Sequence, residues 1–476
     1  MDTFVYKDHK KLRCGYTTGT CAALAAQGAV RFLLTGSWKE REEIMTPKGL
    51  PVAVSLEEKS SGEGWAECAV RKDAGDDYDV TNGILVYARA EFVKDKNFYR
   101  KVQMSHLESS ESGAAGEKEP PGLRLEDGSQ QEKEKPDQQN AESSETLIEI
   151  DGGIGIGRVT KPGLDQPVGA AAINSVPRKM IRDAVYALLE EAGEFLPVSI
   201  IISVPAGVEA AKKTFNPVLG IEGGISVLGT SGIVEPMSEE ALVETIRTHL
   251  NVLRAEGRKW VIAVPGNMGA GFLERYLVEH GKFCTDAHQG SNAADTDAAV
   301  EAEQMAYGEL STGTEPSLLE GFMNSLVTMS NFVGKTIDLA AELGFSGILI
   351  AGHMGKLVKI GNGIMNTHSR EADGRMDTML SCALSAGTED LELLRKIQRS
   401  NTTDEAMDHL KQAGIIEDTI NVFLKRADWH LTHRSRDEVR TGMIVFGTKG
   451  EYLGETEGAD AILRSALKEL DQQAST

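Results

Sequence analysis

The sequence has no long hydrophobic run and no cysteine pattern typical of a cross-linked or zinc-binding protein. No segment approaches the roughly 18 apolar residues of a membrane-spanning helix, and residues 1–19 lack the apolar core of a signal peptide. The five cysteines are odd in number and scattered, with no CxxC pair. This argues against a disulfide framework or a zinc ribbon and predicts a cytoplasmic protein with no membrane anchor.

Positive charge is also in short supply. The 476 residues carry 72 acids and 50 bases, a net charge of −22. Broad binding to nucleic acid or to an acidic membrane surface is therefore not expected. The apolar and charged fractions, 41% and 26%, are ordinary for a globular protein, and the length predicts two or three domains.

Two segments differ in composition from the rest. Residues 104–146 are rich in Glu, Ser, Gln, Gly and Pro and contain 11 acids and 4 bases, which predicts a disordered acidic insertion. Residues 285–319 are acidic and rich in small residues, and we interpret them as a surface insertion.

The remaining pattern predicts an α/β protein. Short alternating segments at 52–56, 65–70 and 84–92 predict antiparallel strands in an N-terminal α+β domain. From Val198 onward, strand, glycine loop and helix repeat, which predicts a Rossmann-like, mostly parallel sheet. A hairpin is expected at 442–455. The expected domains are residues 1–194 (α+β), 195–387 (Rossmann-like), and 388–476 (C-terminal helices and hairpin).

Four apolar strands each run into a glycine-containing loop. They are expected at 198–204, 224–228, 260–264 and 348–351. The carboxyl ends of parallel strands meet at one edge of a sheet, where open α/β sheets bind ligands. We therefore expect all four loops to line one cleft.

The segment Gly347–Asp377 gathers the most chemically useful residues. His353 and Lys356 directly follow an apolar strand, and five polar residues, 366–370, come next. A helix cap and a solvated face would explain the same residues equally well.

Two further stretches could bind anions. The threonines at 17, 18 and 20 precede an alanine-rich segment that should be helical, where they either cap the helix or, with free N–H groups, hold an anion; the plain cap is favoured. Residues 151–169 lack the third glycine of the GxGxxG fingerprint and are interpreted as a glycine-rich ligand loop or flap. Residues 151–182 carry five bases and two acids, which suits an anionic ligand or a solvated helix face.

Possible metal ligands are sparse. Residues 73–83 hold four aspartates without the spacing of a calcium loop, and we favour a polar turn or a substrate-side loop. His430 and His433 share an HxxH spacing but have no glutamate partner. A serine nucleophile in GTSGIVEP is disfavoured, because the GxSxG pattern is missing.

Several motifs, in order along the chain, resemble the CbiD family of cobalt-precorrin-5B C1-methyltransferases. They are LRCGYTTGTCAA, DVTNG, DGGIGIGRVTKPGL, AINSVPRKMI, TFNPVLGIEGGISVLGTSGIVEPMS, PGNMG, SNFVG and GHMGKLVKIGNGIMNTHSR. The resemblance implies a two-domain α/β protein that transfers a methyl group from S-adenosylmethionine to C-1 of cobalt-precorrin-5B. The product is cobalt-precorrin-6A, in anaerobic cobalamin biosynthesis. Tyr78 and Met268 depart from the family pattern.

The resemblance also suggests roles for residues. A sulfonium donor needs alignment more than a protein nucleophile, and glycine loops can hold it with backbone groups. The expected donor-binding residues are Gly229, Thr230, Ser231, Gly232, Gly266, Asn267 and Gly352. The tetrapyrrole carries carboxylates, for which Arg and Lys are natural partners. The expected substrate-binding residues are Thr17, Thr18, Thr20, Arg158, Lys161, Arg178, Lys356 and Arg370. His353 is the first catalytic candidate and His368 the second. The substrate brings its own cobalt, so no protein-bound metal is expected.

Two other functions stay open. A nucleotide-dependent dehydrogenase or kinase would need GxGxxG or GxxxxGK[ST] in the right context, and neither is present. A non-catalytic tetrapyrrole carrier or scaffold of the same pathway would bind the substrate without needing S-adenosylmethionine. The oligomeric state is not predicted.

Overall fold

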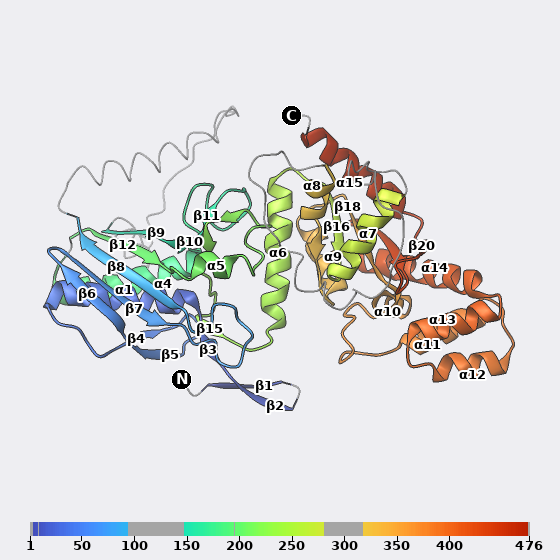
Figure 1. The fold of residues 1–476 in the computed structure, drawn as a ribbon, viewed down its shortest axis with the longest axis horizontal. Coiled ribbons are helices and arrows are strands. Elements are labelled where there is room, and N and C mark those ends of the chain that lie inside the picture. Colours follow the sequence, from blue (N-terminus) through green and yellow to red (C-terminus); the bar gives the residue numbers. More distant parts are fainter. Residues whose placement is uncertain (1–2, 8, 94–146, 195, 280–317, 475–476) are drawn as a thin grey trace, which may run out of the picture. The chain divides into compact units, whose positions relative to one another are not determined.

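The computed structural model describes most of the chain outside the two insertions. The described residues are 3–7, 9–93, 147–194, 196–279 and 318–474. The predictions for residues 104–146 and 285–317 therefore lie outside them. Two compact units make up the fold (Figure 1); the first is Met1–Thr160 with Asp165–Met237, and the second is Lys161–Leu164 with Ser238–Thr476. None of the described helices is both long and apolar enough to cross a membrane.

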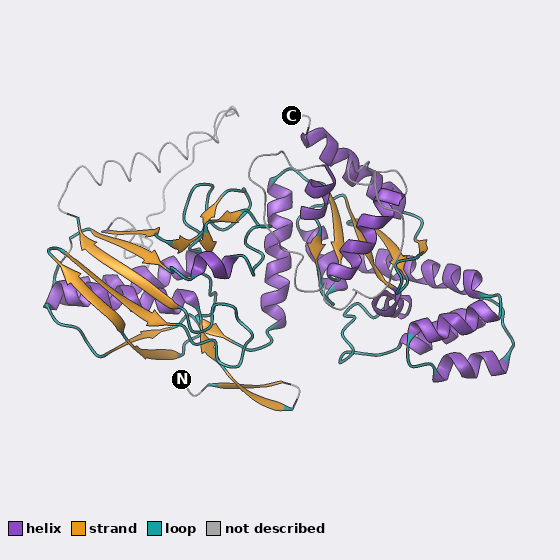
Figure 2. Ribbon diagram, viewed as in Figure 1, coloured by secondary structure: helices purple, strands orange, loops and turns teal. Residues whose placement is uncertain are grey.

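The first unit is built on a five-stranded sheet covered by two helices (Figure 2). The strand order is β6 (Glu57–Gly62), β7 (Trp65–Arg71), β8 (Leu85–Phe92), β12 (Val198–Ser203) and β9 (Ile148–Gly152). β12 runs antiparallel to β8 and parallel to β9. The helices α1 (Thr18–Thr35) and α4 (Ser175–Ala192) share one hydrophobic core with this sheet. The predicted antiparallel strands of this region are confirmed.

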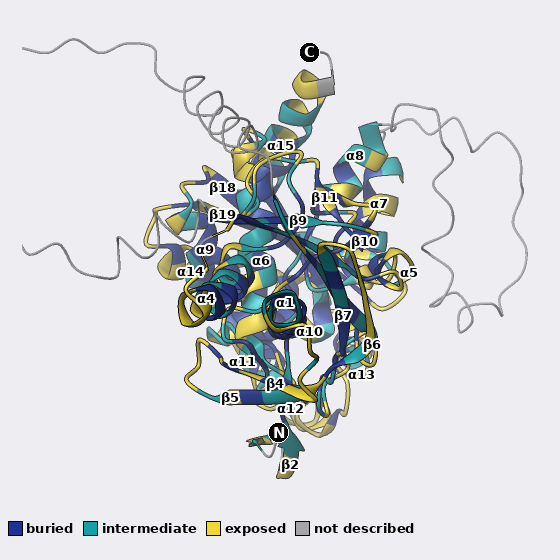
Figure 3. Ribbon diagram, turned by 90° about the vertical axis from the view of Figure 1, so that its left-hand side faces the viewer, coloured by how far each residue is buried: buried dark blue, intermediate teal, exposed yellow. Residues whose placement is uncertain are grey.

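The alanine-rich sequence of α1 explains its central place. Ala, Cys and Gly side chains are small, so the helix can lie close against β7 and β8, and most of its first thirteen residues are buried (Figure 3). At Gly28 a Cβ atom would come within 2.5 Å of the Leu56 side chain. Thr17 caps the helix by accepting a hydrogen bond from the Thr20 N–H.

Short strand pairs and one short helix surround this core. They are β1 (Phe4–Lys7) with β2 (Lys10–Arg13), β3 (Gly15–Tyr16) with β15 (Ile233–Val234), β4 (Arg41–Met45) with β5 (Pro51–Ser55), β10 (Gly155–Ile156) with β14 (Gly224–Ile225), β11 (Arg158–Val159) with β13 (Ile221–Glu222), and α5 (Gly207–Ala211).

The second unit contains the predicted Rossmann-like sheet. Its strand order is β17 (Val327–Thr328), β16 (Trp260–Val264), β18 (Gly347–His353), β19 (Arg440–Phe446) and β20 (Tyr452–Glu455). The first four are parallel, and β20 closes the predicted hairpin with β19. β18 is apolar and almost wholly buried, as expected for a strand covered on both faces.

Helices cover both faces of this sheet (Figure 2). One face packs against α6 (Glu239–Ala255), α9 (Val333–Glu342) and α14 (Ile416–Ser435). The helices α11 (Arg375–Ser385), α12 (Leu391–Arg399) and α13 (Thr403–Gln412) pack against one another, and α11 and α13 also pack against α14, in the same hydrophobic core. The other face packs against α7 (Asn267–Glu279), α8 (Leu318–Asn324) and α15 (Ala459–Ala474). The short helices α10 (Met354–Leu357) and η3 (Val358–Asn362) follow β18.

The structure divides the chain differently from the sequence prediction. β12 was expected to begin the parallel-sheet domain at residue 195, but it completes the first sheet between β8 and β9, and the division falls at 237/238. Residues 388–476 do not stand apart, because β19 belongs to the second sheet. A strand followed by a glycine loop identifies a strand, but it does not say which sheet the strand joins.

The four glycine loops consequently do not share one edge. Only the loops after β16 and β18 follow strands of the same parallel sheet. The loop after β12 and the segment 229–232 belong to the first unit. The expected donor-binding set is thus split into 229–232 in one unit and Gly266, Asn267 and Gly352 in the other.

Candidate functional site

The second sheet has a topological switch point between β16 and β18. The chain leaves β16 toward β17 through α7 and α8 on one face, whereas it leaves β18 toward β19 through helices on the other face. In open α/β sheets, ligands bind outside the carboxyl ends of the strands at such a point. Residues 265–269 and 353–356 flank it, so this is the strongest candidate site.

Backbone atoms approach closely at this point because glycines replace side chains. A Cβ atom on Gly352 would lie 2.9 Å from Cδ of Pro265, and one on Gly269 would lie 3.0 Å from the Ala351 carbonyl oxygen. Asn267 is exposed at the first residue of α7. Gly352 thus lies against Pro265, the residue before Gly266 and Asn267. The donor-binding role of these three residues stays a prediction.

His353 ends β18 and is hydrogen-bonded through both ring nitrogens. Its Nδ1 accepts from the Gly355 N–H at 3.0 Å, and its Nε2 lies 2.8 Å from Oγ1 of Thr448. Thr448 in turn donates to Oδ2 of Asp404 at 2.5 Å. This arrangement fits a neutral imidazole that donates from Nε2.

The electrostatic environment of His353 favours the same state. Burial lowers the pKa of His353, and the nearby Asp404 and Glu451 only partly oppose this shift. With Nδ1 already accepting a hydrogen bond, the ring is arranged to hold neighbouring loops in place. The catalytic role expected for His353 stays a prediction, and the geometry favours positioning.

Lys356 directly follows Gly355, on the short helix α10. Its side chain is exposed, yet desolvation by nearby protein atoms lowers the pKa of its ammonium group. Among the residues that the structure describes, no acid lies within ion-pair distance of it. It is therefore available to an anionic ligand.

The polar segment after η3 is held by the buried Lys359, which the sequence had also suggested as a cation for the tetrapyrrole carboxylates. Lys359 donates to the carbonyl oxygens of Thr367 at 3.1 Å and Ala372 at 2.7 Å. The Thr367 N–H bonds to the Asn331 carbonyl at 2.9 Å, which places this segment beside the residues that follow β17. The segment therefore lies at the carboxyl edge of the sheet.

His368 and Arg370 both lie on this segment. His368 is exposed, and its Nδ1 accepts from the Arg370 N–H at 3.1 Å. The Arg370 guanidinium lies 3.2 Å from Glu239. Their functional roles stay predictions.

In the first unit, the three threonines hold the loop 228–232. Thr20 donates to the Gly232 carbonyl at 2.6 Å, and Thr18 donates to the Leu228 carbonyl at 3.2 Å. Gly229 adopts a φ of 138°, and a Cβ there would lie 2.2 Å from Oγ1 of Thr17. The capping interpretation is confirmed, and the start of α1 is closed by this loop, since the Gly19 N–H already donates to Leu228.

Ser231 and Thr230 differ in their surroundings. The Ser231 hydroxyl donates to the Ile233 carbonyl at 2.9 Å, a local turn contact. Thr230 is exposed. Of these two residues, Thr230 is therefore the more accessible, and the donor-binding role of the loop stays a prediction.

The predicted cationic residues 158, 161 and 178 already have protein partners. Arg158 forms a two-point ion pair with Asp151, at 2.7 and 2.9 Å. Arg178 donates to three main-chain carbonyls, and burial lowers its pKa. Lys161, in the second unit, lies 3.3 Å from Glu256. Of these, Arg158 is the most accessible because its ion pair is nearly half exposed.

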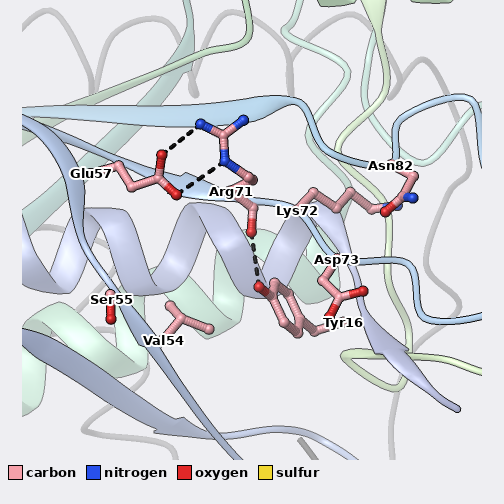
Figure 4. Close-up of a pocket in the computed structure, with 8 residues that line it drawn as sticks. All are labelled: Tyr16, Val54, Ser55, Glu57, Arg71, Lys72, Asp73 and Asn82. Carbon is pink, nitrogen blue, oxygen red and sulfur yellow. Dashed lines mark hydrogen bonds and ion pairs between the residues drawn. The ribbon is translucent and has the colours of Figure 1, made fainter.

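A separate open cavity of about 430 Å³ lies in the first unit (Figure 4). Its lining residues are Tyr16, Val54, Ser55, Glu57, Arg71, Lys72, Asp73 and Asn82. No local pattern in the sequence predicts this cavity, because its lining comes from separate segments.

The charges around this cavity are compensated. Arg71 pairs with Glu57, Lys72 with Asp79, and Asp73 with Arg13. The Arg13 guanidinium lowers the pKa of the Asp73 carboxyl. Burial alone would raise the pKa of Asp79, but Lys72 and Thr81 lower it. The charged side chains in its lining, two acids and two bases, therefore sum to zero among the residues that the structure describes.

The aspartate-rich residues 73–83 form a structured loop rather than an open carboxylate cluster. Asp76 accepts from the Arg13 N–H at 2.6 Å, and Asp77 accepts from the Met237 N–H at 3.0 Å. The polar-turn interpretation fits these contacts. Within the described ranges, no group of three or more His, Cys, Asp or Glu side chains could hold a metal ion.

Comparison with known proteins identifies the family. The CbiD family model matches residues 5–139 and 132–236, and the model of the CbiD C-terminal domain matches 366–457. A cobalt-precorrin-5B C(1)-methyltransferase of Ruminiclostridium cellulolyticum is 35% identical over 99% of this chain and 100% of its own length. One of Methanocaldococcus jannaschii is 33% identical over 94% of this chain and 98% of its own.

A solved structure gives a weaker likeness. The crystal structure of a cobalamin biosynthesis protein (CbiD) from Archaeoglobus fulgidus is 21% identical, covers 78% of this chain and 87% of that chain, and has a TM-score of 0.32. The identity and coverage of the curated relatives, together with the family models, establish that this chain belongs to the CbiD family.

Proposed function

We propose that this chain transfers the methyl group of S-adenosylmethionine to C-1 of cobalt-precorrin-5B, giving cobalt-precorrin-6A in anaerobic cobalamin biosynthesis. The main support is the near full-length similarity to relatives named cobalt-precorrin-5B C(1)-methyltransferase. The switch point of the second sheet adds physical support, because open α/β sheets bind small ligands at such a point.

The chemistry asks for alignment more than for a reactive side chain. The donor methyl is already activated on a sulfonium, so the protein must hold it in line with the ring carbon. We propose that Gly266, Asn267 and Gly352 border the donor site with backbone groups. The 229–232 loop of the first unit is the second candidate for donor contacts.

The remaining residues divide into ligand contacts and supports. Arg158, Lys161, Lys356 and Arg370 are proposed to contact tetrapyrrole carboxylates, for which charge-assisted hydrogen bonds are strong. Thr17, Thr18, Thr20 and Arg178 act through the backbone that they hold. His353 positions the strand end, and His368 stays a candidate for proton transfer.

Anaerobic turnover is the direct test of this function. With cobalt-precorrin-5B and S-adenosylmethionine, we expect a product heavier by one methyl group and an equal amount of S-adenosylhomocysteine. Mass spectrometry checks the mass and the amount of both products. Calorimetric titration with S-adenosylhomocysteine checks that the protein binds it. If the protein binds the tetrapyrrole but forms no S-adenosylhomocysteine, the methyltransferase proposal is wrong and the carrier alternative is supported.

Substituting His353 separates a positioning role from a catalytic one. His353→Asn is expected to lower kcat by about tenfold, or about 1.4 kcal/mol, which is the size of one lost hydrogen bond. The shape of the pH–rate profile should stay unchanged. If His353 were a general base, its replacement would lower kcat by about 100-fold or more, the usual contribution of such a group. It would also remove one limb of the pH–rate profile. Such a loss would contradict the positioning role.

A further inference from the structure

Two lysines follow the ends of adjacent strands at matching positions. β18 and β19 end with His353 opposite Phe446. Lys356 and Lys449 each lie three residues beyond this pair. Both side chains are exposed. Both therefore lie at the carboxyl edge of the sheet, Lys356 beside the switch point and Lys449 one strand further along.

The turn that carries Lys449 is fixed to the end of β18. Thr448 contacts Nε2 of His353 at 2.8 Å and donates to Asp404 at 2.5 Å. A solvated hairpin turn does not need such a chain of side-chain hydrogen bonds, which here joins β18, the β19–β20 turn and α13. The main chain at Lys449 is thus held in a defined place.

Acids near the turn have other partners. The Glu451 carboxylate turns back to accept from the Lys449 backbone N–H at 3.0 Å, and Gly447 leaves room for it, since a Cβ there would lie 2.3 Å from its Oε1. Asp404 accepts from Thr448. In the described part of the chain, neither acid lies within ion-pair distance of the Lys449 ammonium group.

A third cation, Arg275, lies on a helix that covers one face of the sheet. Arg275, on α7, is exposed and lies beside the turn, because a Cβ on Gly450 would lie 2.3 Å from its Nη2. It stacks over Phe272 at 5.1 Å from the ring centroid. Asp404 and Glu451 keep their charges, since their hydrogen-bond donors are neutral. The three cations exceed these two carboxylates by one, and this local positive charge favours an anionic ligand.

We propose that Lys449, together with Lys356 and Arg275, forms a carboxylate-binding site at the carboxyl edge of the second unit, with Thr448 and Asp404 as positioning residues. This inference rests on the proposed methyltransferase function. The carboxylate comes either from the periphery of the tetrapyrrole or from the methionine part of the donor. Charge-assisted hydrogen bonds from Lys and Arg are the usual means of holding such a group.

Steady-state kinetics of Lys449→Met test the site, since methionine keeps the length of the side chain and removes its charge. We expect the KM for one of the two substrates to rise by about tenfold, as for one lost charge-assisted hydrogen bond, while kcat changes little. A rise for cobalt-precorrin-5B alone assigns the site to the tetrapyrrole, and a rise for S-adenosylmethionine alone assigns it to the donor. Lys449→Arg should restore most of the affinity.

Lys468→Met is the matched control. Lys468 is an exposed lysine of α15, and its neighbour Glu469 bonds to the Lys259 N–H just before β16 begins, so it lies at the opposite edge of the sheet. It should change neither KM. If Lys449→Met also changes neither KM, the carboxylate site is wrong.

A binding assay tests the carboxylate site independently of the proposed methyltransferase activity. If the wild type shows no turnover, binding of uroporphyrin, a stable tetrapyrrole polycarboxylate, and of S-adenosylhomocysteine can be titrated with the same variants. Weaker binding of either probe to Lys449→Met, with unchanged thermal unfolding, supports the site. Equal binding of both probes to wild type and variant overturns it. Thr448→Val should weaken the binding of the same probe, and Thr448→Ser should leave it unchanged.

Discussion

Replacing Gly155 by alanine is expected to destabilise the first unit by about 3 kcal/mol or more. Gly155 pairs with Gly224 between β10 and β14 and adopts a φ of 77°. A Cβ there would lie 1.7 Å from the Val204 carbonyl oxygen. Val204 is itself held by a hydrogen bond from its N–H to the Ile154 carbonyl at 2.8 Å. The added methyl group therefore meets backbone that has no room to move away.

Gly223→Ala is the matched control for this substitution. Gly223 also has a positive φ, 82°, but nothing lies within 4 Å of its Cβ position. Alanine there should cost about 1 kcal/mol, the backbone strain alone. Urea denaturation of both variants measures the difference. Equal loss of stability in the two would show that close packing does not explain Gly155.

This contrast gives the GGIGIG motif a structural meaning. The sequence suggested a ligand loop, because glycines often let a phosphate or a cofactor approach. At Gly155 the group that approaches is the Val204 carbonyl. A glycine motif alone does not show whether a ligand or neighbouring backbone approaches it, since both require the absence of a side chain.

The elements that the sequence predicted well are those with local signals. The Thr17 cap, the alanine-rich α1, and α4 with Gly193 after its last residue depend on residues within a few positions of each other. The β19–β20 hairpin likewise depends on a short turn. Such signals fix the type of an element and its approximate ends.

Long-range partners could not be predicted in the same way. β12 looks like any apolar strand before a glycine loop, and its neighbours β8 and β9 are determined by pairing across the chain. The contacts of His353 with Thr448, and through it with Asp404, join residues far apart in sequence. The sequence therefore identified His353 and Lys356 as unusual residues but not the hydrogen bonds that define the role of His353.

Acid is expected to destabilise the second unit through His249. This histidine lies on α6, is only 8% exposed, and has its pKa lowered to about 4 by burial, with a smaller effect of Lys161. The folded protein therefore keeps it neutral, whereas the unfolded chain binds a proton near its ordinary pKa of 6.5.

The direction of the effect follows from this difference in proton binding. Below about pH 6.5 the unfolded state binds more protons than the folded state, so the free energy of unfolding falls as the pH decreases. The loss continues to about pH 4 and amounts to about 3 kcal/mol, from roughly 1.4 kcal/mol for each unit of pKa difference. Above pH 6.5 the ring is neutral in both states, so His249 no longer makes the stability depend on pH.

His249→Gln removes the titrating group and should flatten this part of the pH dependence. Carboxylates also titrate between pH 4 and 6.5, so the informative quantity is the difference between wild type and variant. Urea denaturation at pH 7 and at pH 4.5 measures it, with His433→Gln, an exposed histidine on α14, as the control. If the wild type and His249→Gln lose equal stability between the two pH values, buried His249 is not the cause of acid sensitivity. A smaller loss in His249→Gln, but not in His433→Gln, would show that protonation of this buried ring contributes to the acid sensitivity.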